Sequence, residues 1–274
     1  YRFINFNYKD GVHDKFFYDA VNDKNGLLWI ASGSGIYSYD GARFILYRTS
    51  NPQTGRESSN LIRSLYCDTD GKIWTAGLTS VQWFYPDTRS FRYHSPDNKS
   101  LKQLGTSAIN TFFRDSKGMM WIGTMKNGVA FLNEKDSTVT YFRASAEAGS
   151  PANLITRIIE TPDNRIWALS VDGLHLLSAQ KGILQTFRNT RPNHHPAEEN
   201  YFTDGFFDAA MNCIWIGSFG GGLIQFDLSS HQLIHHDIVH KKIIQNSINA
   251  IAPKSATELW IYNGNLSKKK KKTH

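Results

Sequence analysis

Short apolar runs separated by polar turns recur along the whole chain, and no run sustains the spacing of an amphipathic helix. The runs are rich in Ile, Val, Phe, Tyr and Trp, which favour strands. The turns between them are rich in Asp, Asn and Gly, which tolerate the positive φ angles of tight hairpins. The pattern therefore predicts an all-β chain built from antiparallel hairpins.

The hairpins belong to an internal repeat marked by tryptophan, at intervals of 45, 47, 46, 48 and 45 residues. Six of the seven tryptophans take part: Trp29, Trp74, Trp121, Trp167, Trp215 and Trp260. An apolar run and an Asp- or Asn-containing turn precede most of them, and a Gly and an aromatic stretch follow. Each unit is therefore expected to form four short strands, with the Trp on the second.

Four antiparallel strands in a unit of this length are typical of a β-propeller blade. A recurring Trp fills the space between neighbouring sheets, so we interpret all six as structural. We predict one propeller domain at 1–262, with an N-terminal strand at 1–8, blades at 13–48, 58–95, 105–143, 152–188 and 201–238, and a partial sixth blade at 245–262.

The two ends of the predicted propeller differ. Residues 1–8 match the fourth strand of a unit, and such a strand completes the last blade in closed propellers. The sixth unit fades after Tyr262, so we expect the chain to stop inside a repeat. Residues 263–274 contain five consecutive lysines and are expected to form a disordered tail.

The distribution of charged and apolar residues indicates which partners are not expected. The net charge is +7, but the run Lys268–Lys272 supplies five of these charges, which leaves 7 − 5 = +2 elsewhere. A nucleic-acid partner is therefore not expected, because such binders spread basic residues over a folded face. No apolar stretch is long enough to span a membrane. Cys67 and Cys213 lie in different units and are interpreted as buried free thiols.

The motif Trp-Ile-Gly-Thr at 121–124 and its copy Trp-Ile-Gly-Ser at 215–218, followed by Gly222-Leu223 and Phe226-Asp227, resemble the two-component regulator propeller repeat. The resemblance implies the periplasmic sensor region of a Bacteroides-type hybrid histidine kinase. It further implies an oligosaccharide or other small-molecule ligand, a homodimer in the intact protein, and membrane and kinase segments outside this sequence. No cofactor is implied.

Candidate ligand contacts follow from where propellers bind ligands, at loops and first strands around the central channel. Each first strand carries one polar residue in two neighbouring columns of the repeat: Asp19, Arg63, Asn110, Arg157, Asp204 and Asn249. Such donors and acceptors recognise sugar hydroxyls. The alternative is that they only solvate a water-filled channel.

The loops after the Trp strands add Lys126, Asp172 and Phe219 to the candidates. Trp83 is the one Trp outside the repeat and could stack on a sugar ring, although Phe131 and Leu176 share its column and favour packing within a blade.

Two other classes of function remain open. A propeller lyase would need a base and a stabilising cation, for which His195, Asp172 and Arg157 are available, but no spacing requires that assembly. A protein-interaction propeller would need a large patch that sequence does not reveal. No catalytic residue is predicted. No metal site is predicted either, because adjacent histidines on a strand point to opposite faces and cannot bind one ion together.

Overall fold

The structure is a computed structural model that describes residues 6, 8–49, 60–77, 81–93, 104, 108–134, 136, 138–147, 150–189, 199–236, 247–263 and 266–271. The chain divides into two units. Unit 1 comprises Tyr1–Phe112 and Asn133–Val139, and unit 2 comprises Phe113–Leu132 and Thr140–His274.

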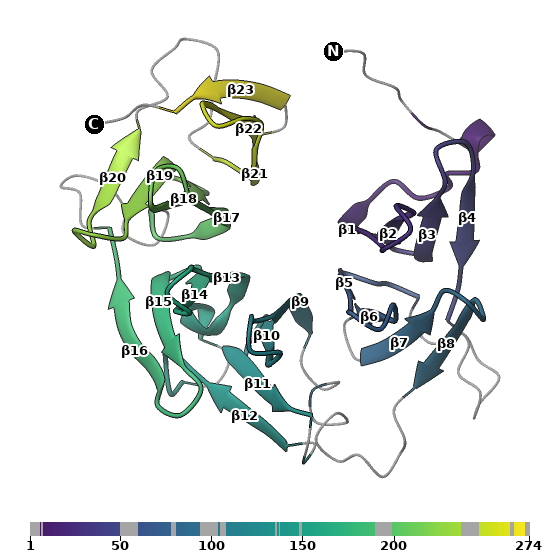
Figure 1. Cartoon of the computed structure of the whole chain (residues 1–274), viewed down its shortest axis with the longest axis horizontal. Helices are drawn as coiled ribbons and strands as arrows, with labels where there is room; N and C mark the ends of the chain where they lie inside the picture. The colour runs from purple at the N-terminus through teal and green to yellow at the C-terminus, as the bar shows by residue number, and fades with distance from the viewer. Residues whose placement is uncertain are drawn as a thin grey trace. The chain divides into compact units, whose positions relative to one another are not determined.

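The described strands form six antiparallel sheets in which consecutive strands are neighbours (Figure 1). The first contains β1 (Phe17–Asn22), β2 (Leu28–Ser32), β3 (Gly35–Tyr39) and β4 (Phe44–Tyr47). The second contains β5 (Ser64–Cys67), β6 (Ile73–Ala76), β7 (Val81–Tyr85) and β8 (Ser90–Tyr93). The third contains β9 (Ile109–Arg114), β10 (Met120–Thr124), β11 (Val129–Asn133) and β12 (Thr138–Phe142).

The fourth sheet contains β13 (Ile155–Glu160), β14 (Ile166–Ser170), β15 (Gly173–Ser178) and β16 (Gly182–Phe187). The fifth contains β17 (Phe202–Asp208), β18 (Cys213–Ser218), β19 (Gly222–Asp227) and β20 (Leu233–His236). The sixth contains β21 (Ala250–Pro253), β22 (Glu258–Tyr262) and β23 (Leu266–Lys270). Two short 3-10 helices, η1 (Tyr8–Asp10) and η2 (Pro151–Asn153), complete the described elements. The prediction of an all-β chain built from four-stranded antiparallel blades is confirmed.

The prediction can be compared with the structure at the C-terminal end of the chain, but hardly at the N-terminal end. The N-terminal strand expected at 1–8 lies outside the described residues, apart from Phe6, which packs edge-on against Tyr39 and Phe44, and Tyr8, which begins η1. At the other end, Leu266–Lys270 forms β23 instead of a disordered tail, because β22 offers an unpaired edge, and Trp260 pairs with Lys268 in the ladder. A lysine-rich strand is tolerated at a sheet edge.

The indole N–H of each repeat Trp in the first five sheets donates a hydrogen bond to the turn before it. The pairs are Trp29 with Asp23 (2.9 Å), Trp74 with Asp68 (2.9 Å), Trp121 with Asp115 (2.9 Å), Trp167 with Thr161 (3.2 Å) and Trp215 with Asp208 (3.1 Å). These five rings are at most 1% exposed. The bond therefore satisfies a buried donor and ties the turn to the core.

Glycine at the start of the third strand allows the fourth strand to approach closely. Gly128 has a φ of +75°, and a Cβ there would lie 2.1 Å from the carbonyl oxygen of Phe142. Gly173 has a φ of +128°, and its Cβ would lie 2.5 Å from the carbonyl oxygen of Phe187. Any side chain at these two positions would collide with the backbone of the fourth strand, whereas a Cβ at Gly222 in the fifth sheet would meet open space.

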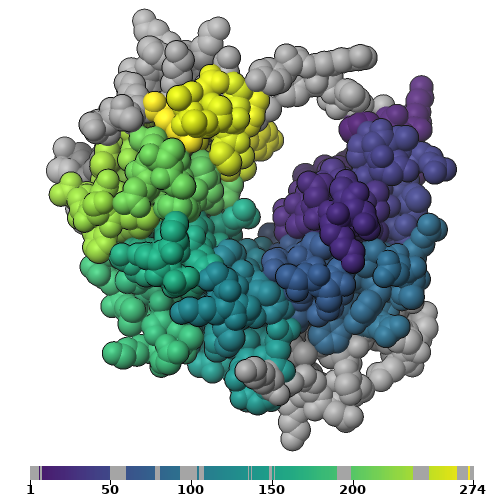
Figure 2. All heavy atoms as spheres, viewed as in Figure 1, coloured from purple at the N-terminus to yellow at the C-terminus, as the bar shows by residue number. Residues whose placement is uncertain are grey.

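The apolar cores lie between neighbouring sheets. In unit 2, one core joins the fourth and fifth sheets around Trp167 and Phe226, and another joins the fifth and sixth around Trp215 and Leu259. Figure 2 shows the described atoms of the sixth sheet (yellow) lying against those of the fifth (green). The Trp column thus fills the spaces between sheets, as a propeller blade requires.

No helix in the described part of the chain has the length and apolar character to cross a membrane. Cys67 and Cys213 are free thiols, and burial raises the pKa of Cys213 to about 12. Both therefore serve as small packing groups.

Candidate functional site

Three first strands of unit 2, β13, β17 and β21, lie side by side (Figure 1). Each carries one residue of the predicted polar row: Arg157 on β13, Asp204 on β17, and Asn249 directly before β21. The Arg157 side chain is 50% exposed, and Asn249 is exposed. The fold therefore brings these three predicted residues to neighbouring strands of one unit.

A β-bulge sets the direction of the side chains at this row. The ladder of β13 with β14 shifts register between Ile155 and Arg157, and that of β17 with β18 shifts between Phe202 and Asp204. The extra residue is a threonine in both strands. The hydroxyl of Thr156 donates to the carbonyl of Phe202 at 2.7 Å, and the hydroxyl of Thr203 donates to the carbonyl of Ile248. Each bulge thus aims a hydroxyl at the next sheet.

Asp204 uses its carboxylate to join sheets. One carboxylate oxygen accepts a hydrogen bond from the backbone N–H of Ile251 on β21 at 3.0 Å. The other accepts one from the backbone N–H of the adjacent Gly205 at 2.9 Å. The guanidinium of Arg157 lies 3.6 Å away. Burial raises the pKa of Asp204, and the positive charge of Arg157 acts in the opposite direction.

Unit 1 repeats this arrangement with Asp19. Its carboxylate accepts the backbone N–H of Leu65 at 2.8 Å and the hydroxyl of Ser64 at 3.3 Å, so it joins β1 to β5. The guanidinium carbon of Arg63 lies 5.3 Å from the centre of the exposed Tyr18 ring. Asn110 lies on β9 and is partly buried.

The row therefore contains two kinds of group. Asp19 and Asp204 are engaged in joining sheets, whereas Arg157 and Asn249 present donors to solvent. Arginine and amide groups supply the fixed donors and acceptors that recognise hydroxyl groups. Arg157 and Asn249 are thus the members of the row whose side chains are most accessible to a ligand.

The predicted loop residues are separate from this row. Asp172 forms a two-bond ion pair with Arg188, at 3.1 and 2.5 Å, which raises the pKa of Arg188. Phe219 is 50% exposed, and its ring lies 5.5 Å from that of Tyr201. Lys126 is exposed in the turn before β11.

Trp83 packs inside the second sheet. Its ring lies edge-on to that of Trp74, with 5.4 Å between the centroids, and the Lys72 amine lies 6.0 Å from its centroid. This contact matches the alternative of packing within a blade, and sugar stacking by Trp83 stays a prediction.

The residues named for a lyase site do not form one cluster in the described structure. Asp172 is paired with Arg188 and Arg157 with Asp204, while His195 lies outside the described residues. Among the described residues, no three His, Cys, Asp or Glu side chains converge as metal ligands would.

A chain of polar side chains is buried in the fourth sheet. His175 contacts the hydroxyl of Ser170 at 2.8 Å through Nε2 and that of Thr186 at 2.9 Å through Nδ1. Burial lowers the pKa of His175 to about 4. Ser170 and His175 are both fully buried, and the Ser170 hydroxyl also caps the following turn at Asp172. The chain therefore supports the turn that holds Asp172.

Sequence reasoning missed an asparagine that anchors the loop between two sheets. The Asn200 amide accepts the backbone N–H of Asn189 at 2.6 Å and donates to its carbonyl at 3.1 Å. Asn153 does the same for Ser145, and Asn60 accepts the N–H of Thr49. A column of Asn two residues before Ile62, Ile155 and Phe202 was the signal available in the sequence.

Comparison with known protein families identifies a match within the chain. Residues 103–126, which contain β9 and β10, match the model of the family described as two component regulator propeller. This segment is similar to the two-component regulator propeller repeat. The match confirms the resemblance that its Trp-Ile-Gly-Thr motif indicates. A comparison with curated protein sequences gives no match.

Comparison with solved structures identifies propellers of different kinds. The extracellular domain of BT4673 from B. thetaiotaomicron, assigned to a one-component system, is 18% identical with a TM-score of 0.67, over 92% of this chain and 37% of that one. That of BT3049 from the same organism, assigned to a hybrid two-component system, is 17% identical with a TM-score of 0.59, over 94% and 40%.

Virginiamycin B lyase from Staphylococcus aureus is 14% identical with a TM-score of 0.66, over 96% of this chain and 86% of that one. At such identities the likeness establishes the β-propeller fold alone. The chain spans about 37% of the length of the BT4673 domain and about 40% of that of BT3049.

Proposed function

We propose that the chain is the ligand-sensing propeller module of a two-component signalling protein, and that its ligand is an oligosaccharide. The observation that carries the proposal is the two-component regulator propeller repeat at 103–126, whose Trp–Asp arrangement recurs in other sheets of the chain. The likeness to extracellular domains of B. thetaiotaomicron signalling systems supports it.

In this proposal the module lies in the periplasm, does no chemistry itself, and acts within a homodimer. Ligand binding shifts a conformational equilibrium that reaches the kinase through segments beyond this sequence. The ligand contacts in unit 2 are Arg157 and Asn249, with Asp204 holding the guanidinium in place. The remaining candidates, Asp19, Arg63, Asn110, Trp83, Lys126, Asp172 and Phe219, contribute less, because the structure engages most of them in contacts within the protein.

Calorimetric titration of the 274-residue chain tests this proposal with four neutral trisaccharides: maltotriose, cellotriose, xylotriose and mannotriose. At least one should bind, and Arg157→Ala should weaken that binding about tenfold, the equivalent of one charged hydrogen bond. Arg43→Ala is the matched control, since Arg43 is also an exposed arginine in a loose ion pair, 3.9 Å from Asp40. Failure of all four sugars, or equal affinity of Arg157→Ala and the wild type, would contradict the proposal.

A further inference from the structure

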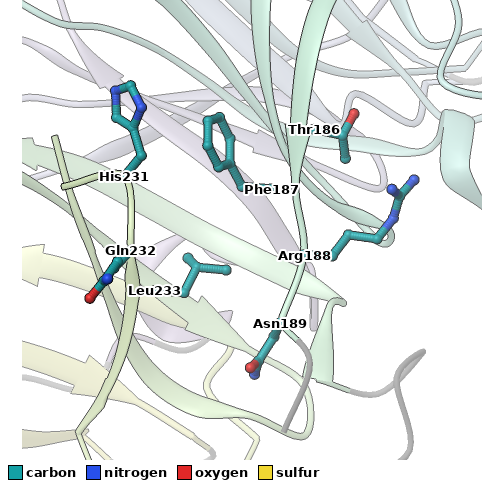
Figure 3. Close-up of a pocket in the computed structure, with 7 residues that line it drawn as sticks. All are labelled: Thr186, Phe187, Arg188, Asn189, His231, Gln232 and Leu233. Atoms are coloured by element: carbon teal, nitrogen blue, oxygen red, sulfur yellow. The ribbon is translucent and has the colours of Figure 1, made fainter.

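A groove of about 400 Å³ lies in unit 2, away from the polar row. One wall is the end of β16, with Thr186, Phe187, Arg188 and Asn189. The other is the start of β20 and the turn before it, with His231, Gln232 and Leu233. Figure 3 shows Phe187, Leu233 and Asn189 directed into the space between these walls.

The floor of the groove is aromatic and rigid. The ring of Phe187 lies 4.9 Å from that of Phe226 and 5.5 Å from that of His231, measured between centroids. His231 also stacks on Phe226 with an angle of 6° between the planes. The turn that holds His231 is fixed, because its backbone N–H donates to the carbonyl of Asp227. An apolar sugar face packs well against such preformed rings.

One buried donor in the groove has no partner. Asn189 is 7% exposed, and its side-chain N–H₂ makes no hydrogen bond within the described structure. A buried amide in this state costs free energy, so buried polar groups are normally paired. The backbone of Asn189 is held on both sides by Asn200, which fixes the direction of the amide.

The equivalent positions after the first and third sheets differ from Asn189. Thr49 occupies the same place beside Asn60, and its hydroxyl donates to the Asn60 amide at 2.8 Å. Ser145 occupies it beside Asn153, and its hydroxyl accepts the N–H of Glu147. At both places the side chain is satisfied within the protein, whereas Asn189 lines the groove with a side-chain nitrogen that has no partner.

The charge of the groove is balanced. Arg188 is the one arginine or lysine among the described lining residues, and Asp172 neutralises it through two hydrogen bonds. A ligand with its own charge therefore gains little there. A neutral molecule with hydroxyl groups and an apolar face suits the Asn189 donor and the aromatic floor together.

We propose that the groove formed by Phe187, Asn189 and His231 is a second binding site for a neutral saccharide, with the Asn189 amide donating to a sugar hydroxyl. The choice of a saccharide as the ligand rests on the sensing function proposed above. It adds a site that is separate from the Arg157 row and lies on β16 and the β19–β20 hairpin.

The variant Asn189→Thr tests the site, because it copies Thr49 and so keeps a side chain that can bond to the anchoring asparagine. We expect it to fold like the wild type and to bind the trisaccharide found above about tenfold more weakly in this groove. His231→Asn should weaken binding in the same way, because it removes the aromatic ring. The variant should still fold, since Asn tolerates the φ of +57° at this position. Lys117→Ala is the control, because its exposed side chain lies in the β9–β10 turn, outside the groove and outside the predicted ligand contacts.

The readout is a titration followed by NMR of the side-chain amide groups, in which the Asn189 signal is assigned by its absence from Asn189→Thr. The proposal predicts that the trisaccharide shifts this signal. If binding is lost only in Arg157→Ala and the Asn189 signal does not move, the groove is not a saccharide site and the sensing function stands. If binding is lost in Asn189→Thr but retained in Arg157→Ala, the groove stands and the Arg157 row is wrong. If no trisaccharide binds the wild type, both are overturned.

Discussion

The fifth and sixth sheets carry the same Trp motif, but the surroundings of the indole differ. Trp215 is 1% exposed, donates to Asp208, and lies 4.8 Å from the ring of His236 on the fourth strand. Trp260 is only partly buried, and the amine of Lys254 lies 5.5 Å from its ring. The described part of the sixth sheet ends with its third strand.

This comparison separates what the motif determines from what the neighbours supply. Both tryptophans lie on the second strand of their sheet and pair with the first, so the local pattern suffices to place the strand. Full burial of Trp215 requires the fourth strand of its own sheet and the core shared with the sixth. A repeat therefore forms its hairpin locally but gains its stability from the sheets beside it.

Removing the two indoles gives the largest expected effects. Trp215→Ala should lower the free energy of unfolding by about 4 kcal/mol, the usual loss for a fully buried aromatic. Trp260→Ala should lower it by about 1 kcal/mol, because less apolar surface returns to water. Urea denaturation of both variants measures the difference, and equal losses would show that the sixth sheet is packed as tightly as the fifth.

The turn that precedes the Trp provides a second pair. Asp115 accepts the indole N–H of Trp121 and the backbone N–H groups of Lys117 and Met119. Asp115→Ala leaves these donors unpaired and should cost about 3 kcal/mol. Lys254 occupies the equivalent position of the sixth sheet, and Lys254→Ala should cost about 1 kcal/mol, since it removes a single, partly buried ion pair with Glu258. A similar cost for both would refute the structural importance of the Asp–Trp bond.

Acid should destabilise the fourth sheet through the buried His175, a group that the described residues of the sixth sheet lack. Burial lowers the pKa of His175 from 6.5 to about 4, so the unfolded chain takes up a proton in this range more readily than the folded one. The contribution of His175 to the free energy of unfolding is fully present above pH 6.5. It is lost as the pH drops, and the loss reaches about 3 kcal/mol at about pH 4.

Hydrogen exchange of the backbone amides of β14 and β15 measures this loss. The variant His175→Gln, which carries no titrating group, should exchange with a weaker dependence on pH between 6.5 and 4. A wild type and a variant with the same pH dependence would show that another group controls the acid response.

Much of the fold could be predicted from the sequence, since the Trp, Gly and aromatic columns report local hairpins. The Asp column was only partly readable. Asp208 lies seven residues before Trp215 instead of six, and Thr161 replaces the carboxylate with a hydroxyl, so neither fits a column of Asp six residues before the Trp. The strand β23 was missed because a run of lysines resembles a solvated tail, while its pairing depends on the edge of β22.

The candidate site was harder to predict than the fold. The polar row was visible as two columns, but its division into sheet-joining carboxylates and exposed donors depends on the β-bulges and on which neighbour each side chain meets. The groove at Asn189 gave no signal, because Asn189 and His231 are 42 residues apart and meet only through the packing of two sheets.

The most direct test of the sensing function is a crystal structure of the chain grown with the trisaccharide that it binds. The account predicts a sugar at the row, with hydroxyl groups in hydrogen-bond distance of the Arg157 guanidinium and the Asn249 amide. A bound sugar that leaves both of these side chains in contact with water alone would contradict it.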